Sequence, residues 1–165
     1  QQAMGVLYAL AYTIKMSKLT DKVPEGYMEY VVPPLEGLWW CGAAALDLDA
    51  PREQWQWISL IRQPEFVTQA VFEDAVASCQ RKKPGLPLER AQLIRFEEGL
   101  CVHAMHVGPY AQEAETLAAM RAFMAQNGLT EETGAVRKHH ELYLSDPRKT
   151  VPERLKTVLR LPVRR

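Results

Sequence analysis

The order in which helical and strand-like patterns follow one another is the feature of this sequence that most limits its fold. Apolar residues recur at the 3.6-residue period of an amphipathic helix in three segments, which are residues 3–16, 66–81 and 111–127. Alternating or β-rich runs predict strands in six segments, which are residues 27–40, 54–62, 92–97, 100–107, 138–145 and 155–163. The order helix, strand, strand therefore occurs near the start and again after Tyr110, which indicates a duplicated unit.

We predict an α+β fold in which an antiparallel sheet carries the helices on one side. The strand predicted at 100–107 precedes the helix of the second unit, whereas no strand precedes the helix at 3–16. A first unit that lacks this preceding strand would leave an open sheet edge and an uncovered apolar stripe around Leu10. We therefore expect the natural polypeptide to carry a further N-terminal strand, which pairs beside the strand around Trp57 and completes the first unit.

The bulk composition limits the class of protein. A length of 165 residues fits one domain spanning 1–165, and 47% apolar with 24% charged residues is typical of a globular protein. Lysine plus arginine and aspartate plus glutamate number 20 each, so no net positive charge attracts a phosphate backbone and we expect no nucleic-acid partner. No apolar run approaches the length of a spanning helix, so we expect no membrane partner. Three widely spaced cysteines predict reduced thiols and a cytoplasmic location.

Glu141 is the strongest candidate for a functional residue. Strand alternation places His139, Glu141 and Tyr143 on one face of the strand at 138–145, and leucines on the other face. We expect the leucine face to pack on the helices, so that Glu141 faces a cleft. A carboxylate there is suited to act as a general base, or as a counter-charge for a cationic ligand. The alternative is a solvated glutamate on an exposed sheet face.

Tyrosines and tryptophans supply the aromatic surface that a flat ligand needs. Tyr8 and Tyr12 form a second stripe on the first helix, and four tryptophans lie in the strands at 27–40 and 54–62. Such side chains bury a large apolar area and still offer a hydrogen bond. The alternative is that these aromatic residues belong to the core, and we expect about half of them to line a pocket.

The four histidines do not predict a metal site. His103 and His106 are three residues apart on a strand, and His139 and His140 are adjacent, so the two members of each pair point to opposite faces. We therefore expect no metal and no cofactor. Glu36 lies between two prolines and two tryptophans, where a bend could direct it either to a cleft or to solvent.

Four segments together resemble the GyrI-like small-molecule-binding family. They are 7–12 (LYALAY) with Lys15, 32–40 (VPPLEGLWW), 106–110 (HVGPY) and 139–148 (HHELYLSDPR). The resemblance implies two pseudo-twofold-related strand-helix-strand-strand modules around a central ligand cleft. Because no helix-turn-helix pattern precedes the domain in this sequence, the chain is closest to the stand-alone branch of the family. That branch resembles hydrolases that open the cyclopropane of DNA-alkylating natural products.

The residues and the resemblance together lead to a set of predicted site residues. The predicted catalytic residues are Glu141, Tyr8 and Tyr12. The predicted ligand-binding residues are Trp39, Trp40, Trp57, Tyr110, Tyr143, Glu36 and His139. The predicted partner is a small hydrophobic or aromatic molecule, and the predicted state is a monomer or a weak homodimer.

Two functions fit these residues. In the first, Glu141 activates water for attack on a cyclopropane conjugated to a dienone, while a tyrosine hydroxyl donates a hydrogen bond to the carbonyl oxygen. In the second, the domain binds or senses lipophilic cations, with Glu141 as the counter-ion and the aromatic residues in cation–π contacts. A third function, inhibition of a toxin or a topoisomerase, is disfavoured because the chain is neutral overall and lacks an acidic stretch that would mimic DNA.

Overall fold

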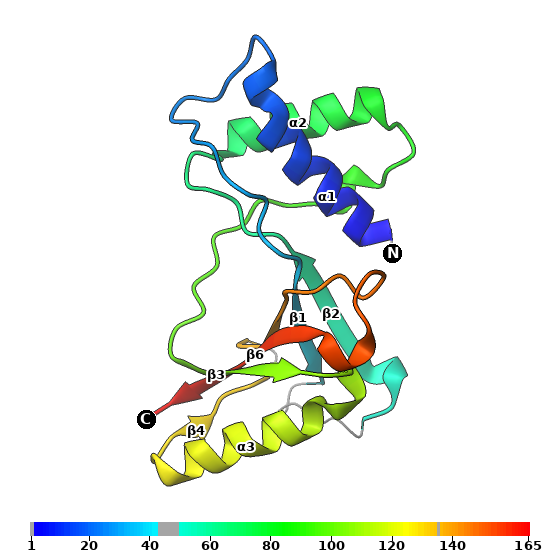
Figure 1. Cartoon of the computed structure of the whole chain (residues 1–165). Coiled ribbons are helices and arrows are strands. Elements are labelled where there is room, and N and C mark those ends of the chain that lie inside the picture. Colours follow the sequence, from blue (N-terminus) through cyan, green and yellow to red (C-terminus); the bar gives the residue numbers. More distant parts are fainter. Residues whose placement is uncertain (1, 43–49, 135) are drawn as a thin grey trace. The chain divides into compact units, whose positions relative to one another are not determined.

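The computed structural model describes residues 2–42, 50–134 and 136–165, and the chain folds into two compact units (Figure 1). The first unit comprises Gln1–Pro34 and Leu60–Phe96, and the second comprises Leu35–Ser59 and Glu97–Arg165. Helices and an antiparallel sheet are both present, which confirms the predicted α+β class. Within the described residues, no helix has the length and apolar character needed to cross a membrane.

The first unit is built on a pair of helices, α1 (Gln2–Lys15) and α2 (Gln69–Lys82), which pack against each other (Figure 1). The short 3₁₀ turns Met16–Leu19 and Leu88–Arg90 follow them. Thr68 caps the N-terminus of α2, because its side chain accepts a hydrogen bond from the amide of Val71. The apolar stripes then meet in one core, whose buried members are Val6, Ala9, Leu10, Ile14, Val67, Ala75, Cys79 and Leu88.

The second unit is a sheet with one helix. Its strands are β1 (Glu36–Cys41), β2 (Trp55–Leu60), β3 (Cys101–Val107), β4 (Thr130–Glu131), β5 (His139–Tyr143) and β6 (Lys156–Arg164). They are ordered β2-β1-β5-β6-β3, and β4 pairs separately with β6. The pairs that β5 makes with β1 and β6 are antiparallel, so β5 lies in the middle of the sheet with partners on both edges.

Helix α3 (Glu113–Gln126) covers one face of this sheet. Its buried residues Leu117, Met120 and Met124 join one apolar cluster with Leu159, Leu161 and Val163 of β6. Because Glu141 pairs with Leu159 in the antiparallel register, Glu141 lies on the face that α3 covers. The expectation that the leucine face of β5 carries the helix is therefore wrong for α3, and Leu144 of that face is 47% exposed.

Two predicted strands do not form as predicted. Residues 27–40 pair only from Glu36 onward, because Pro33 and Pro34 lack the amide hydrogens that a sheet ladder needs. Residues 92–97 form no strand, although their composition is β-rich, and β3 pairs with β6. A β-rich composition is thus not sufficient for a segment to join a sheet.

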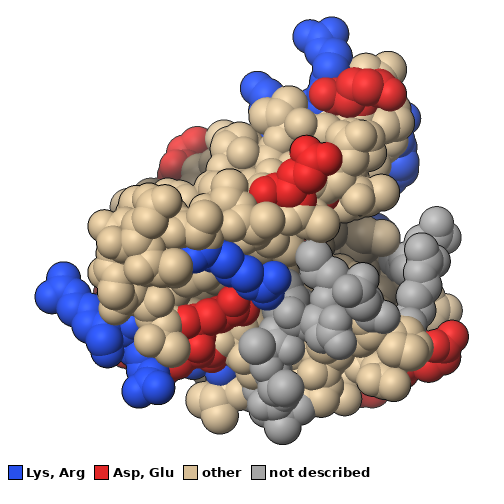
Figure 2. Space-filling view, turned by 90° about the horizontal axis from the view of Figure 1, so that it is seen from below, with Lys and Arg blue, Asp and Glu red and all other residues tan. Residues whose placement is uncertain are grey.

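Charged side chains of both signs are interspersed on the surface. Figure 2 shows acidic groups lying beside basic groups on the face that it draws, with uncharged residues over most of the rest. The 20 acidic and 20 basic residues of the sequence are therefore not separated into one acidic and one basic region on this face.

Candidate functional site

A chain of hydrogen bonds surrounds the carboxylate of Glu141 on the α3 face of the sheet. His139 Nε2 lies 3.0 Å from Glu141 Oε1, and the hydroxyl of Tyr143 donates to Glu141 Oε2 over 2.7 Å. The indole Nε1 of Trp39 in turn donates to the hydroxyl oxygen of Tyr143 over 2.8 Å. Strand alternation brings the three β5 side chains to one face, and pairing of Trp39 with His139 in the β1–β5 register adds the indole.

The hydrogen-bond partners of His139 determine where a proton must lie. Its Nδ1 is 3.0 Å from the carbonyl oxygen of Arg160, which can only accept, so Nδ1 carries a proton. The Nε2 atom then faces a carboxylate oxygen of Glu141, and a hydrogen bond there needs a second proton, held either by His139 or by Glu141. The His139–Glu141 pair therefore shares one proton in a buried position, with side chains 2% and 12% exposed.

Gly37 leaves the space that this series of hydrogen bonds occupies. It pairs with Glu141 across β1 and β5, and a Cβ atom at this position would lie 2.7 Å from Trp39 Nε1 and 2.8 Å from the Tyr143 hydroxyl. Real Cβ contacts are longer than this, so any side chain here would push the indole and the phenol apart. Only glycine at this position is compatible with the hydrogen bond from Trp39 to Tyr143.

A second carboxyl group, that of Glu113, belongs to the same site. Glu113 is the first residue of α3, three positions after Tyr110 in the Gly-Pro-Tyr step. Burial, together with the negative charge of Glu141, raises the pKa of Glu113 to about 8. Burial, Glu113 and Glu141 also raise the pKa of Tyr110, and burial with the adjacent Glu141 raises that of Tyr143 well above its usual range. These four groups therefore influence one another.

Aromatic rings surround the carboxyl groups. The ring of Tyr110 meets that of Tyr143 edge-on at 6.1 Å, and Trp39 lies 6.2 Å from Trp55 and 6.4 Å from Trp57. Trp55 also packs against the apolar cluster under α3, whereas Trp57 is 50% exposed. The site thus combines a fixed inner part with aromatic edges that solvent can reach.

The opposite face of the same strands holds a separate polar network. His140 Nδ1 lies 2.8 Å from Glu98 Oε1, and its Nε2 lies 2.8 Å from Glu36 Oε2. Arg160 donates to the second oxygen of Glu98 over 2.7 Å. Burial by itself would lower the pKa of His140, but the hydrogen bonds and charges of Glu36 and Glu98 raise it to about 9. His140 is therefore an imidazolium held between two carboxylates at neutral pH.

Comparison with known protein families gives a match to the part of the chain that holds this site. The family model of the GyrI-like small molecule binding domain matches residues 62–164, which include Tyr110, Glu113, His139, Glu141 and Tyr143. The chain belongs to the GyrI-like small-molecule-binding domain family. No curated protein is significantly similar to it.

Solved structures from Listeria innocua match nearly the whole of this GyrI-like chain. A conserved, uncharacterized protein is 54% identical with a TM-score of 0.93, and a protein described as a hydrolase is 52% identical with a TM-score of 0.90. A hydrolase encoded by lin2189 is also 52% identical, with a TM-score of 0.89. Each match covers 99% of this chain and 79% of the other chain, so Trp39, Trp55 and Trp57 fall within the similarity as well.

The GyrI-like structure brings some of the predicted site residues together and separates others. The predicted residues that meet around Glu141 are His139, Tyr143, Trp39, Trp57 and Tyr110. Glu36 lies on the opposite face in the network of His140, and so does Trp40, whose ring lies 4.7 Å from Lys138 Nζ. The structure thus answers the question left open for Glu36: it points neither into the Glu141 site nor freely into solvent. Ligand binding by Glu36 and Trp40 stays a prediction, as a surface separate from the Glu141 site.

Tyr8 and Tyr12 belong to the first compact unit, whereas Glu141 belongs to the second. Their rings lie 6.4 Å apart on α1, and Tyr12 is 52% exposed, so its hydroxyl is accessible. The predicted catalytic pairing of these tyrosines with Glu141, and the predicted cleft between two modules, concern both units and stay predictions. Lys15 donates to the carbonyl of Tyr30 within the first unit.

Glu113 is the site residue that the sequence did not indicate. Acidic residues in the first turn of a helix usually interact with the helix dipole at the surface, and Glu115 of the same turn is indeed exposed. The available signal was position: Glu113 follows Tyr110 by three residues, so both side chains lie near the start of α3. His106 has a structural position, with its ring nitrogens hydrogen-bonded to the Thr116 hydroxyl and to the carbonyl oxygen of Pro109.

In the described part of the chain, no three His, Cys, Asp or Glu side chains are placed so that they could hold a metal ion.

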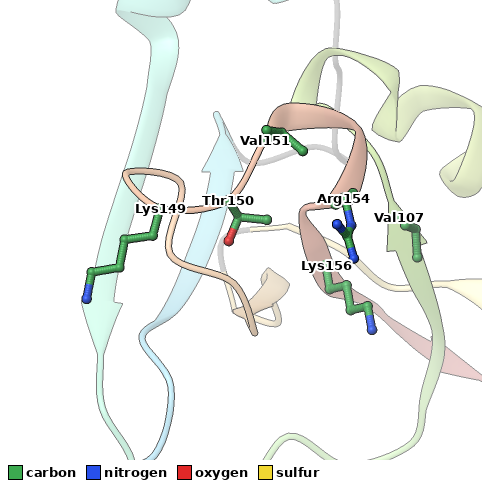
Figure 3. Close-up of a pocket in the computed structure, with 6 residues that line it drawn as sticks. All are labelled: Val107, Lys149, Thr150, Val151, Arg154 and Lys156. Carbon is green, nitrogen blue, oxygen red and sulfur yellow. The ribbon is translucent and has the colours of Figure 1, made fainter.

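A hollow of about 480 Å³ lies elsewhere in this GyrI-like domain, lined by Val107, Lys149, Thr150, Val151, Arg154 and Lys156 (Figure 3). Lys149 points to one side of it, away from Arg154 and Lys156, so the cationic groups do not converge on one ligand position. Its strand residues Val107 and Lys156 lie on the face opposite Glu141.

Proposed function

We propose that this protein binds a flat hydrophobic molecule against the aromatic rings around Glu141 and hydrolyses it by adding water to a strained cyclopropane. Membership of a small-molecule-binding family supports the binding step. The Listeria innocua proteins described as hydrolases, at 52% identity, support a hydrolytic reaction. The host benefit is detoxification of DNA-alkylating cyclopropanoid compounds.

The hydrogen bonds of Glu141 carry this proposal. A general base needs an acceptor that is fixed in place and can pass its proton on, and the Glu141 carboxylate is held by His139 on one oxygen and Tyr143 on the other. His139 is itself fixed by the carbonyl oxygen of Arg160, so the imidazole cannot turn away. The arrangement is typical of a base whose orientation is set by further groups.

The reaction needs little more than this base. The Glu141–His139 pair removes a proton from water, and the water oxygen forms a bond to a cyclopropane carbon. The strained carbon–carbon bond breaks, and its electron pair moves into the conjugated dienone, which becomes a phenolate. Protonation of that oxygen completes the addition of one water. General-base assistance of about 10² to 10⁴-fold is sufficient, because strain release and aromatisation already favour the reaction.

The hydrogen bonds of Tyr143 support a positioning role for it in this mechanism. Its hydroxyl proton is directed at Glu141, and its oxygen accepts from Trp39. Tyr143 therefore positions the base, and the donor to the substrate must be another group.

Incubation of the protein with a cyclopropanoid alkylator tests the proposal. Mass spectrometry should find a product heavier by one water. Replacement of Glu141 by Gln should abolish turnover while leaving ligand affinity within about tenfold, because glutamine keeps the shape but cannot take up a proton. Glu153→Gln, at an exposed position in the turn before β6, is the matched control and should behave as wild type. Absence of the hydrated product with wild-type protein would overturn the proposed reaction.

A second function, binding or sensing of lipophilic cations, is favoured by one observation. The carboxyl group of Glu141 lies beside the rings of Tyr143 and Tyr110, and a carboxylate next to aromatic rings attracts an aromatic cation. A series of cationic and neutral dyes of similar shape separates the two functions. A binder should prefer the cations, and Glu141→Gln should then weaken binding as much as it weakens any other activity.

A further inference from the structure

Glu113 is unusual among the acidic residues of the described chain because one of its carboxyl oxygens is buried without a hydrogen-bond partner. Its Oε1 atom is fully shielded, and no described group bonds it. A buried carboxyl oxygen left in this way costs free energy, so a native structure that retains one needs an explanation. Catalysis is such an explanation when the group lies in a site whose chemistry would use it.

The surroundings of Glu113 keep it in the protonated form. Burial and the charge of Glu141 on β5 raise the pKa of Glu113, and Glu113 in turn raises the pKa of Tyr143 on β5 and of Tyr110 in the turn before α3. His139 is linked to Glu141, and Asp146, in the loop after β5, acts on Tyr110. A helix N-terminus ordinarily favours an ionised carboxylate, but burial and the charge of Glu141 outweigh it and raise the pKa of Glu113 to about 8. At neutral pH, Glu113 is thus a carboxylic acid.

The site therefore contains two carboxyl groups in different states. Glu141 is hydrogen-bonded to His139 and Tyr143, whereas Glu113 is protonated at neutral pH and its Oε1 atom has no described hydrogen-bond partner. Pairs of titratable groups whose surroundings separate their proton affinities are the usual basis for dividing an acid role from a base role. The hydroxyl of Tyr143 is already committed to Glu141, so it does not compete with Glu113 for this role.

We propose that Glu113 is the general acid of the hydrolysis, donating its proton to the substrate oxygen that becomes a phenol. This inference rests on the proposed function of the site. The water proton goes to the Glu141–His139 pair, and the electron pair of the broken carbon–carbon bond moves to the dienone oxygen. Glu113 gives that oxygen its proton and becomes a carboxylate. Exchange with solvent returns a proton to Glu113 and removes one from the pair, so the net reaction is addition of one water.

The pH profile of turnover tests this role. In wild type, kcat/KM should fall as the pH rises through about 8, because the acid form of Glu113 is lost. Glu113→Gln should lower kcat about 100-fold, leave KM within about threefold, and remove this alkaline fall. Glu113→Asp, which keeps a carboxylic acid on a shorter side chain, should recover part of the rate and the alkaline fall with it.

Two controls make the outcome decisive. Glu115→Gln changes an exposed acid in the same helical turn and should match wild type, and thermal unfolding should show that every variant is folded. A substrate whose phenol product is more acidic needs less proton donation, so Glu113→Gln should lose less activity with it. The inference is overturned if Glu113→Gln retains the alkaline fall or works within about threefold of Glu115→Gln.

The failure of the proposed function has a different signature. If wild-type protein forms no hydrated product, wild type and all variants are equally inactive, and both the hydrolase proposal and the acid role fall. If wild type forms the product and the Glu113 variants do so equally well, the hydrolase proposal stands and only the acid role falls.

Discussion

The stability of the second unit should depend on pH through His140, because this imidazolium is buried between Glu36 and Glu98. Its pKa rises from 6.5 to about 9 on folding. A group whose pKa is raised in the folded state stabilises fully below the unfolded value and loses that contribution as the pH rises through the folded value. The stabilisation is therefore complete below about pH 6.5 and lost by about pH 9 to 10.

The size of the effect follows from the shift. A change of the pKa from 6.5 to about 9 corresponds to between about 3 and 4 kcal/mol at most, since one pKa unit is about 1.4 kcal/mol. Glu36 and Glu98 are 12% and 18% exposed, so solvent screens part of the interaction and we expect about 2 kcal/mol. Burial by itself would raise the pKa of Glu98, but its contacts with His140 and Arg160 lower it. The His140–Glu98 interaction therefore affects the pKa of both partners, and its free energy is counted only once.

Urea unfolding monitored by tryptophan fluorescence measures the stability of the second unit, which contains His140. All four tryptophans lie within Leu35–Ser59, so the signal reports on the second unit alone. Glu113 also titrates, and its raised pKa contributes its own loss of stability up to about pH 8. The useful quantity is therefore the difference between wild type and His140→Gln, in which the contribution of Glu113 cancels.

We expect this difference in unfolding free energy to shrink by about 2 kcal/mol between pH 6.5 and 9.5. His103→Gln, which changes an exposed histidine on β3, is the control and should leave the pH dependence of wild type intact. A constant difference across this pH range would refute the reasoning, because it would mean that His140 carries no extra proton in the folded state.

Two further predictions concern the Glu141 site. Gly37→Ala should lower turnover about fivefold, because its Cβ would separate Trp39 from Tyr143 and remove one hydrogen bond of about 1 kcal/mol. Gly85→Ala, where a Cβ meets nothing within 4 Å, should not change kcat in the same steady-state assay. Tryptophan emission should respond to titration with a flat aromatic compound, and Trp57→Phe should reduce this response because Trp57 is 50% exposed. If wild-type emission stays unchanged in a titration that calorimetry finds saturating, the prediction of a tryptophan contact is wrong.

The sequence predicted the parts of this structure that depend on local pattern. The helices follow from apolar periodicity and from signals such as Thr68 before α2 and Gly128 after α3, where a positive φ of 65° suits glycine. Strand alternation correctly placed His139, Glu141 and Tyr143 on one face, because this period is a property of any strand.

The sequence could not predict features that depend on pairing between distant segments. Which face of β5 the helix covers is decided by the register of Glu141 against Leu159, and both faces carry candidate residues. The burial of Glu113 depends on the packing of α3 against the sheet, since the same residue type at an exposed helix start is ordinary. Residues 92–97 have strand-like composition, but they form no strand, and β3 pairs with the distant β6.

The position of β6 has a consequence for how the chain reaches this structure during synthesis. Strand β6 separates β3 from β5 and pairs with both, yet it is formed by residues 156–164, and Cys101 of β3 pairs with Pro162 about sixty positions later. During synthesis on the ribosome, β3 therefore has no strand to pair with until nearly all of the second unit has been made. Its apolar and hydrogen-bonding edges stay open to other nascent chains during that interval, so assembly should be slow and sensitive to chaperone supply.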